Sequence, residues 1–144
     1  SIDTSYGALN WPGPLPKSPT DLQQHNCLHY PRSQDTPVWS FTPAKSGKGR
    51  ETINVPVRGS LAANNSEALR EAALTGAGIA LLPDFSAQES LRKGQLVPVL
   101  PDWRVDGGFG RRIFAIRPYT PHVPRAVSAL VAHLREGLVG GFAA

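Results

Sequence analysis

The residues best placed to do chemistry lie in a polar stretch that precedes a short amphipathic segment. Asn64, Asn65, Ser66 and Glu67 are followed by a run with helical apolar spacing that ends at Gly76. Asn64 can cap a helix there, and Glu67, three residues later, can reach back to the Asn64 amide as in a capping box. The free N–H groups and positive end of such a helix attract small polar or anionic ligands. The stretch therefore predicts either a ligand site or plain scaffolding, because a helix followed by a buried strand is also a common structural unit.

A second group of potential ligands, His25, Cys27 and His29, alternates along the chain. On a strand these side chains would share one face, and imidazole and thiolate are common metal ligands. No fourth ligand is evident, and a short alternation arises easily by chance. The sequence also lacks a base, nucleophile and orienting group at catalytic spacing, a nucleotide-binding glycine loop and a CxxC motif. We therefore expect no catalytic residues, no metal, no cofactor and no enzyme.

The composition is that of an ordinary globular domain. The chain has 144 residues, 40% hydrophobic and 18% charged, which is enough for one core. The net charge of +4 is mild, and the basic residues form no dense stripe with interleaved aromatics, so this chain is not expected to contact nucleic acid directly. No apolar run approaches the roughly 18 residues of a membrane span, so no membrane contact is expected.

Two residue counts bear on the setting of the chain. A single cysteine excludes an intrachain disulfide framework and fits a reducing compartment. The sequence contains no methionine, and its first residues show neither the basic nor the apolar region of a signal peptide. We therefore expect a cytoplasmic location and a chain that is a piece of a longer protein or a processed product.

Alternating helix and strand patterns surround the polar residues. Residues 1–17 are rich in proline and glycine and are expected to be irregular. A short helix should follow the N-cap Ser18, and a second capping box, Ser86 with Glu89, should start a helix that ends at Gly94. The other expected helices are 65–75 and 121–138, and the expected strands are 27–30, 38–41, 53–57, 79–82, 96–100 and 112–117, with loops at 43–50 and between the last two strands. This order predicts an α/β fold, with a mixed sheet and helices on both faces.

Glycine and proline mark the ends of several elements. Gly76 is expected to end its helix in the left-handed conformation. Pro83 is expected to stop the apolar strand that precedes it. Pro56 indicates that its own strand lies at the edge of a sheet or contains an irregularity.

The last helix carries an apolar stripe on one face. Its members recur at helical spacing and are Val123, Val127, Leu130, Val131, Leu134 and Leu138. A bare stripe of this size seldom persists in a soluble monomer. We therefore expect this helix to dock against another copy of the chain or to fold back on its own lobe.

Several of these segments together are similar to one known family. The resemblance covers Ser5 to about Leu138 and rests on the order of Pro16–Leu22, His25–Leu28, Trp39–Phe41, Asn64–Leu69, Gly76–Phe85, Gly94–Leu100 and Ile113–Ile116. Each segment alone is weak, but their order and spacing are specific. The chain resembles the effector-binding domain of LysR-type transcriptional regulators.

The resemblance implies a fold of two α/β lobes, of the periplasmic-binding-protein type 2 class, with an effector bound in the cleft between them. By this template residues 1–16 enter the hinge, residues 17–112 form the second lobe, and residues 113–144 supply a hinge strand and the C-terminal helix of the first lobe. The implied function is to bind a small-molecule metabolite and so control transcription. DNA would be bound only by a helix-turn-helix domain that lies outside this chain, and the protein would be a homo-oligomer.

The resemblance also implies where the effector binds. The residues that match the second-lobe wall of the cleft are Leu61, Ala62, Ala63, Asn64, Asn65, Leu82, Pro83 and Phe85. The backbone N–H groups at Asn65 and Ser66 would meet a carboxylate or another polar head. Leu82 and Phe85 would supply an apolar wall, although either could equally be a core residue.

Two alternatives stay open. In peroxide-sensing members of the family a His-Cys-Leu sequence carries the sensor thiol, whereas here Asn26 separates His25 from Cys27. Cys27 is therefore either such a sensor, with no second cysteine to pair with, or a small buried apolar residue. The chain could also be a fragment of a periplasmic solute-binding protein, which shares the two-lobe fold, but the order of segments favours the regulator.

Overall fold

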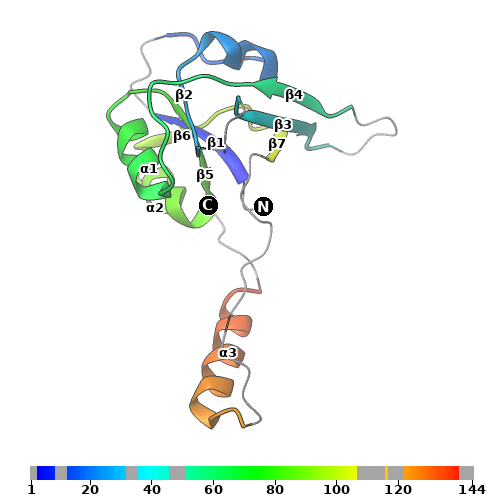
Figure 1. Ribbon diagram of the computed structural model, residues 1–144, viewed down its shortest axis with the longest axis vertical. Coiled ribbons are helices and arrows are strands. Elements are labelled where there is room, and N and C mark those ends of the chain that lie inside the picture. The colour runs from blue at the N-terminus through cyan, green and yellow to red at the C-terminus, as the bar shows by residue number, and fades with distance from the viewer. Residues whose placement is uncertain are drawn as a thin grey trace.

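The computed structural model describes residues 3–8, 13–31, 36–45, 51–106, 116 and 122–139, with the backbone alone for 3–8. The strands form a four-stranded sheet in the order β2-β5-β1-β6 and a three-stranded sheet in the order β4-β3-β7 (Figure 1). The first sheet contains β1 (Asp3–Ala8), β2 (Cys27–Leu28), β5 (Ile79–Pro83) and β6 (Leu96–Pro98). The second contains β3 (Val38–Pro43), β4 (Ile53–Pro56) and β7 (Trp103–Asp106). The helices are the 3-10 helix η1 (Pro19–Gln24), α1 (Ser66–Leu74), α2 (Asp84–Arg92) and α3 (Arg125–Gly137).

The four-stranded sheet is mixed, as predicted, and is built around β5. Every residue of β5 is buried, which agrees with its continuous apolar sequence. β2 runs parallel to β5, whereas β1 runs antiparallel to both β5 and β6. The prediction that residues 1–17 are irregular is therefore wrong for β1. The prolines that suggested it lie after β1, and the strand is stabilised by pairing with distant segments.

The three-stranded sheet is antiparallel, with β3 at its centre. β4 lies at the edge, which confirms the prediction from Pro56. β7 was predicted to be loop but pairs with β3, where Val105 lies opposite Phe41. Trp103 and Val105 alternate with two charged residues, which is a strand-like pattern, but it covers only four residues and is decided by pairing with β3. The predicted strand 112–117 lies outside the described residues except for Ile116, and so does most of the predicted loop 43–50.

α1 begins one residue later than predicted. Asn65, not Asn64, is its N-cap, and the Asn65 Oδ1 atom accepts a hydrogen bond of 3.0 Å from the Ala68 N–H. Glu67 is then the second helical residue instead of the third, so the predicted capping box with Asn64 is wrong. The C-terminal prediction is confirmed, because Gly76 has a φ of 78°. There Gly76 N–H bonds to Ala73 O and the next N–H bonds to the carbonyl of Ala72, which is the Schellman arrangement.

α2, in contrast, begins earlier than predicted. It starts at Asp84, directly after β5, and its N-cap is Pro83 without a side-chain cap. The predicted box of Ser86 and Glu89 is wrong, because Ser86 lies within the first turn and is buried, whereas Glu89 pairs with Arg92 and Lys93. The first-turn carboxylate of Asp84 suits the positive end of the helix. Gly94, with a φ of 67°, follows the helix as expected.

η1 follows its prediction closely. Ser18 is the N-cap and Pro19 the first helical residue. The Asp21 carboxylate accepts hydrogen bonds of 2.9 Å from the backbone N–H groups of Lys17 and Ser18. These two hydrogen bonds are the main reason that the pKa of Asp21 is lowered.

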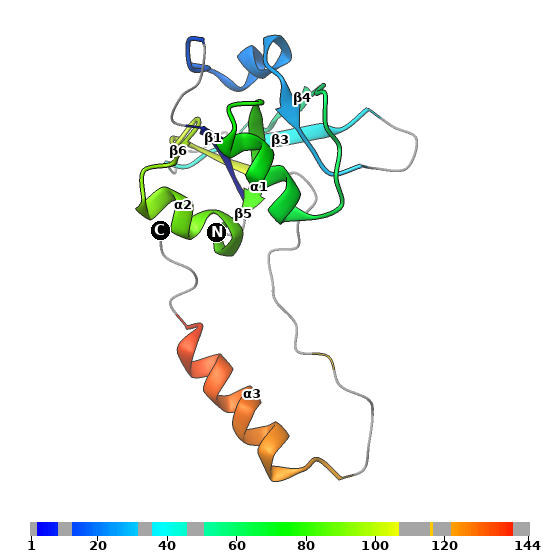
Figure 2. The ribbon, with the colours of Figure 1, turned by 90° about the vertical axis from the view of Figure 1, so that its left-hand side faces the viewer.

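Two apolar clusters cover the two faces of the four-stranded sheet. Ile79 and Leu81 of β5 face a cluster with Trp39 and Phe41 of the second sheet and Leu22 of η1. The alternate residues of β5, Ala80 and Leu82, face a second cluster that is covered by α1 and α2. The two α-helices thus lie on one face, as Figure 2 shows, and the helical cover predicted for the other face is limited to η1.

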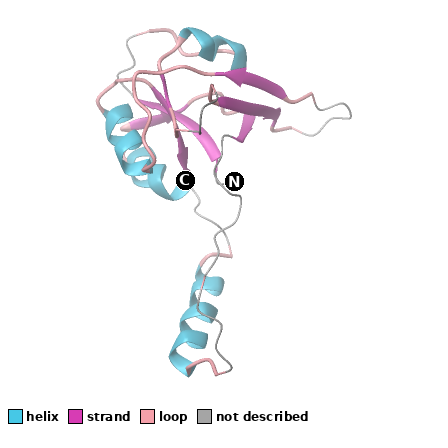
Figure 3. Cartoon of the chain, in the orientation of Figure 1, coloured by secondary structure: helices cyan, strands magenta, loops and turns pink. Residues whose placement is uncertain are grey.

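α3 stands apart from both sheets (Figures 1 and 3). None of its described residues is buried, and Leu130 and Leu134 are 57% and 44% exposed. The prediction that this helix folds back on its own lobe is therefore wrong, whereas association with another copy stays a prediction. Of the helices described, none has the length and apolar character needed to cross a bilayer.

Candidate functional site

The polar stretch singled out in the sequence lies at the carboxyl ends of two parallel strands. β2 and β5 run in the same direction, and in open α/β sheets ligands bind outside the carboxyl ends of such strands. β5 leads directly into α2, and α1 runs back along the sheet, so both helices start at this edge. The segment before α1 is attached to the end of β2, because His29 N–H bonds to Leu61 O at 3.2 Å and Ala63 N–H bonds to His29 O at 3.1 Å.

Some of the predicted site residues are exposed, and the others are partly or fully buried beneath them. Ala62, Asn64, Asn65 and Phe85 are exposed, with Phe85 at 49%, so these residues are accessible to a ligand. Leu61 and Ala63 are half-buried and pack against the cluster beneath α1 and α2. Leu82 and Pro83 are buried, and Leu82 has no exposed surface. Of the two roles considered for Leu82 and Phe85, Leu82 is a core residue that supports the edge, whereas Phe85 presents apolar surface.

The start of α1 has one hydrogen-bonding partner that the sequence pattern did not reveal. The Tyr30 hydroxyl, just beyond β2, hydrogen bonds with the side chain and backbone of Ser66. Burial raises the pKa of Tyr30, and the hydrogen bonds with Ser66 act in the opposite direction. The Asn65 side chain holds the Ala68 N–H, whereas the first N–H groups of a helix have no partner within the helix and can bind a ligand.

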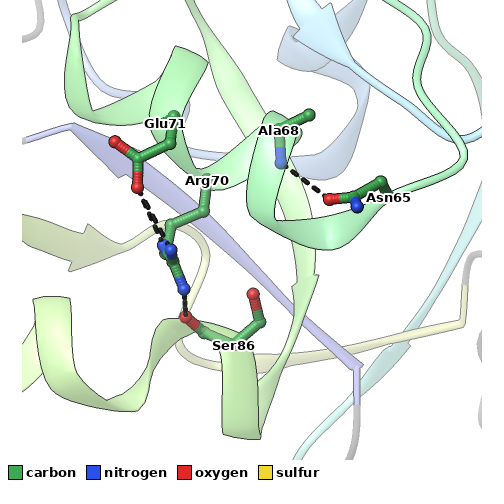
Figure 4. Close-up of polar contacts among 5 residues, drawn as sticks. All are labelled: Asn65, Ala68, Arg70, Glu71 and Ser86. Atoms are coloured by element: carbon green, nitrogen blue, oxygen red, sulfur yellow. Dashed lines mark hydrogen bonds and ion pairs between the residues drawn. The ribbon is translucent and has the colours of Figure 1, made fainter.

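Arg70 joins the two helices that border the site. Its Nη1 atom donates to the carbonyl of Ser86 at 3.2 Å, and its Nη2 atom contacts Glu71 Oε1 at 3.1 Å (Figure 4). The Arg70 side chain is 28% exposed, so this bridge between α1 and the first turn of α2 is partly shielded from water. Helical periodicity alone places Arg70 on the polar face and gives no signal of the bridge. It is a tertiary contact.

The His25, Cys27 and His29 group does not form a metal site. Among the described residues no three His, Cys, Asp or Glu side chains come together as metal ligands. Cys27 is fully buried, and its Sγ atom lies 3.5 Å from the Leu22 carbonyl. His29 Nδ1 lies 3.0 Å from the Cys27 carbonyl, so its ring is held by the backbone.

Burial also governs the reactivity of Cys27. Desolvation raises the pKa of the Cys27 thiol to about 12. The thiolate is the reactive form of cysteine, so this side chain is poorly suited to react with an oxidant. Its surroundings favour the small buried apolar residue over the sensor thiol.

One described cavity lies elsewhere in the fold. It has a volume of about 140 Å³ and is lined by residues that include Leu15, Lys17, Leu100 and Trp103. None of the predicted site residues lines it. The cavity therefore gives no support to the predicted site, which rests on the strand ends and helix starts described above.

Comparison with known proteins identifies the family. Residues 10–139 match the model of the LysR substrate binding domain. The chain is 34% identical to the HTH-type transcriptional regulator PtxR of Pseudomonas aeruginosa over 139 residues, which cover 94% of this chain and 43% of PtxR. It is 30% identical to the probable HTH-type transcriptional regulator LtrA of Klebsiella pneumoniae, covering 84% of this chain and 38% of LtrA. These relatives are transcriptional regulators, which are not enzymes.

Solved structures agree with this assignment. The full-length virulence activator AphB of Vibrio cholerae, a member of the LTTR protein family, superposes with a TM-score of 0.60 and 30% identity, covering 73% of this chain and 35% of AphB. CrgA of Neisseria meningitidis, at 23% identity and a TM-score of 0.55, shares the fold. The chain thus spans less than half the length of PtxR, LtrA and full-length AphB. It belongs to the LysR substrate binding domain family, the effector-binding part of LysR-type transcriptional regulators.

Proposed function

We propose that this chain senses a small-molecule metabolite for a LysR-type transcriptional regulator, and that the metabolite binds at the edge formed by residues 61–65, Pro83 and Phe85. The observation that supports this proposal is the convergence of two helix starts at the carboxyl ends of the parallel strands β2 and β5. Loops and helix starts at this edge of an open sheet are where α/β folds bind small polar molecules.

The exposed groups at this edge suit a ligand with a polar head and an apolar body. The side-chain amides of Asn64 and Asn65 offer hydrogen bonds, the first turn of α1 adds backbone N–H groups, and Phe85 offers an apolar surface. Leu82 contributes from beneath by filling the core under the strand end. The acidic side chains in the first turns of both helices, Glu67 and Asp84, oppose a ligand whose only feature is negative charge.

The rest of the regulator is part of the same proposal. We infer that DNA is bound through a helix-turn-helix domain outside this chain and that the regulator acts in the cytoplasm as a homo-oligomer. We also infer that the second wall of the cleft belongs to the first lobe, to which residues 113–144 contribute only a hinge strand and the C-terminal helix. The relatives named as HTH-type regulators favour this function over a periplasmic solute-binding protein. A helix-turn-helix sequence encoded upstream of this segment would support it directly.

Substitution of the α1 cap tests the site. In the full-length protein, the metabolite that co-purifies is identified by native mass spectrometry, and its affinity is then measured by calorimetry. Asn65→Leu should lower that affinity about tenfold or more, because the bulky apolar side chain blocks the helix start and desolvates its N–H groups. DNA binding should remain intact.

Two control variants separate binding from helix stability and from general surface effects. Asn65→Ser keeps a good N-cap and leaves the site open, so the affinity should stay within about threefold of wild type. Asn54→Leu alters an exposed asparagine on the other sheet and should change nothing at the site. An unchanged affinity in Asn65→Leu would refute the proposed site. The isolated 144-residue chain should bind weakly or not at all, because the second wall is missing.

A further inference from the structure

One asparagine side chain holds together three segments that lie far apart in the sequence. The Nδ2 atom of Asn26 donates to Ser60 Oγ at 2.8 Å and to the Ala77 carbonyl at 2.6 Å. Its Oδ1 atom accepts from the Ser60 N–H at 2.7 Å. The backbone of the same residue accepts from the Ile79 N–H at 2.9 Å. Asn26 therefore connects the start of β2, the segment that leads to α1 and the turn between α1 and β5.

The backbone packs tightly on both sides of this residue. A Cβ atom on Gly59 would lie 1.9 Å from the Cys27 carbonyl oxygen, and one on Gly78 would lie 2.2 Å from the Asn26 carbonyl oxygen. Both approaches are possible only without a side chain. The two glycines let the flanking segments come close enough for the Asn26 amide to reach both of them.

From Asn26 the hydrogen bonds continue along β2 toward the proposed site. Cys27 N–H bonds to the Arg58 carbonyl at 2.9 Å, and His29 then exchanges hydrogen bonds with Leu61 and Ala63. Asn65 follows two residues after this ladder and caps α1. The pairing of residues 58–63 with β2 thus determines where the exposed asparagines and the first N–H groups of α1 lie.

Asn26 also holds the opposite end of α1. Ala77 is the last residue of the Schellman arrangement, in which its N–H bonds to the Ala72 carbonyl at 3.1 Å. The carbonyl of the same Ala77 accepts from Asn26 Nδ2. α1 is therefore tied to one side chain from both directions, through the turn that ends it and through the segment that leads into it. Sliding α1 along its axis would break both connections.

We propose that Asn26 is a positioning residue of the effector site. It lies at the amino end of β2, away from the site, and fixes both the register of residues 60–65 and the axial position of α1. The inference rests on the proposed function for the importance of that site, and on the contacts above for the positioning itself. Only a primary amide can make the three side-chain hydrogen bonds of Asn26, because they use two N–H donors and one carbonyl acceptor at once. An aspartate of the same shape lacks both donors and would place a carboxylate against the Ala77 carbonyl oxygen.

Amide hydrogen exchange measured by NMR on the purified chain tests the proposal without any effector. In Asn26→Asp the N–H groups of Ala63 and Ala68 should exchange about tenfold faster or more than in wild type, because the donors to Ser60 and Ala77 are lost. The amides of β3 should stay within about twofold of wild type, since this strand belongs to the other sheet. Ser60→Ala removes one acceptor and keeps the other two bonds, so it should accelerate the same two amides by a smaller factor of about two to five.

The matched control is Asn54→Asp. Asn54 Oδ1 accepts a hydrogen bond of 2.7 Å from Ser40, which an aspartate can still accept, so exchange at Ala63 and Ala68 should not change. Unchanged exchange at those amides in Asn26→Asp, or equal acceleration in β3 and α1, would overturn the proposal. If Asn26→Asp does not fold, unchanged rates in Ser60→Ala overturn it instead. If the full-length wild type binds no effector, the proposed function is contradicted. If the variants keep wild-type amide exchange rates and effector affinity, only the positioning role is contradicted.

Discussion

α1 and α3 are both amphipathic helices, but only α1 has a surface to pack against. α1, with nine residues, buries Ser66, Leu69 and Ala73 against the sheet. α3, with 13 residues and a more regular apolar stripe, buries none of its described residues. An apolar stripe therefore predicts that a partner surface exists, but it does not predict which surface that is.

The two helices also differ in how their ends are stabilised. α1 has the Asn65 side chain at its start and the Gly76 turn at its end. α3 starts after Pro124 without a side-chain cap, with Arg125 at its positive end and no acidic residue in its first turn. Short helices are marginal in water without tertiary packing. The stability of α3 should therefore depend on a surface that covers its apolar stripe. α1 already packs on the sheet, so the loss of one cap should matter less to it.

Thiol labelling should show the largest difference between α3 and the rest of the described fold, meaning the two sheets with η1, α1 and α2, which we call the lobe. With its pKa raised from 9.0 to about 12, Cys27 has very little thiolate at pH 8, whereas a cysteine introduced as Ser128→Cys on the exposed face of α3 should keep the ordinary pKa. Labelling of Cys27 with a disulfide reagent should therefore be roughly a thousandfold slower. Urea should make the two rates equal.

The pH dependence of this thiol has a definite sign. Its folded pKa is raised, so above the ordinary value near 9.0 the folded chain binds more protons than the unfolded chain. The contribution of Cys27 to stability is therefore complete below pH 9.0 and is lost as the pH rises toward 12. Equal labelling rates in the folded protein would contradict the buried thiol and revive the sensor hypothesis.

Truncation of one leucine in each helix should show the next largest difference. Leu69 is fully buried in α1, so Leu69→Ala should lower the free energy of unfolding of the lobe by about 2–5 kcal/mol. Leu134 is 44% exposed, so Leu134→Ala should change that free energy by less than about 0.5 kcal/mol. Urea denaturation followed by tryptophan fluorescence measures both values.

The same leucine tests what covers α3. If the stripe docks on another copy of the chain, Leu134→Ala should shift the molecular mass seen by light scattering toward the monomer, whereas Leu69→Ala should not. A wild-type monomer at all concentrations would refute association through α3. Similar unfolding penalties in the two variants would contradict the difference between the helices.

Two glycines should respond in opposite directions. Gly59→Ala forces a Cβ against the Cys27 carbonyl and should destabilise the lobe by about 1–3 kcal/mol or more, because the obstacle is backbone. Gly137 is the last residue of α3, and a Cβ there meets nothing within 4 Å. Gly137→Ala should be neutral or should stabilise α3 by about 0.5–1 kcal/mol. Thermal unfolding followed by circular dichroism measures both effects. Unchanged stability in Gly59→Ala would contradict the close approach of Gly59 to the Cys27 carbonyl.

The elements with a local cause could be predicted from the sequence. The apolar run of β5 ends at Pro83, Gly76 ends α1 in the left-handed conformation, and Ser18 starts η1. The family resemblance placed the candidate site near residues 61–65 and 82–85, and the structure brings these segments together at one sheet edge. The site itself remains a proposal, because effector contacts involve partners that a single lobe does not contain.

Contacts between distant segments decided the rest. β1 and β7 are short segments that become strands because they pair with other strands. Asn65 and not Asn64 is the N-cap of α1, and Asn26 bonds to Ser60 and Ala77. Both features depend on how the segment before α1 pairs with β2. Hydrophobic period, turn residues and caps act within a few positions of the chain, so the sequence alone determined where most elements lie and which faces are apolar. Only the tertiary structure decided which faces meet, because pairing and burial are properties of two segments at once.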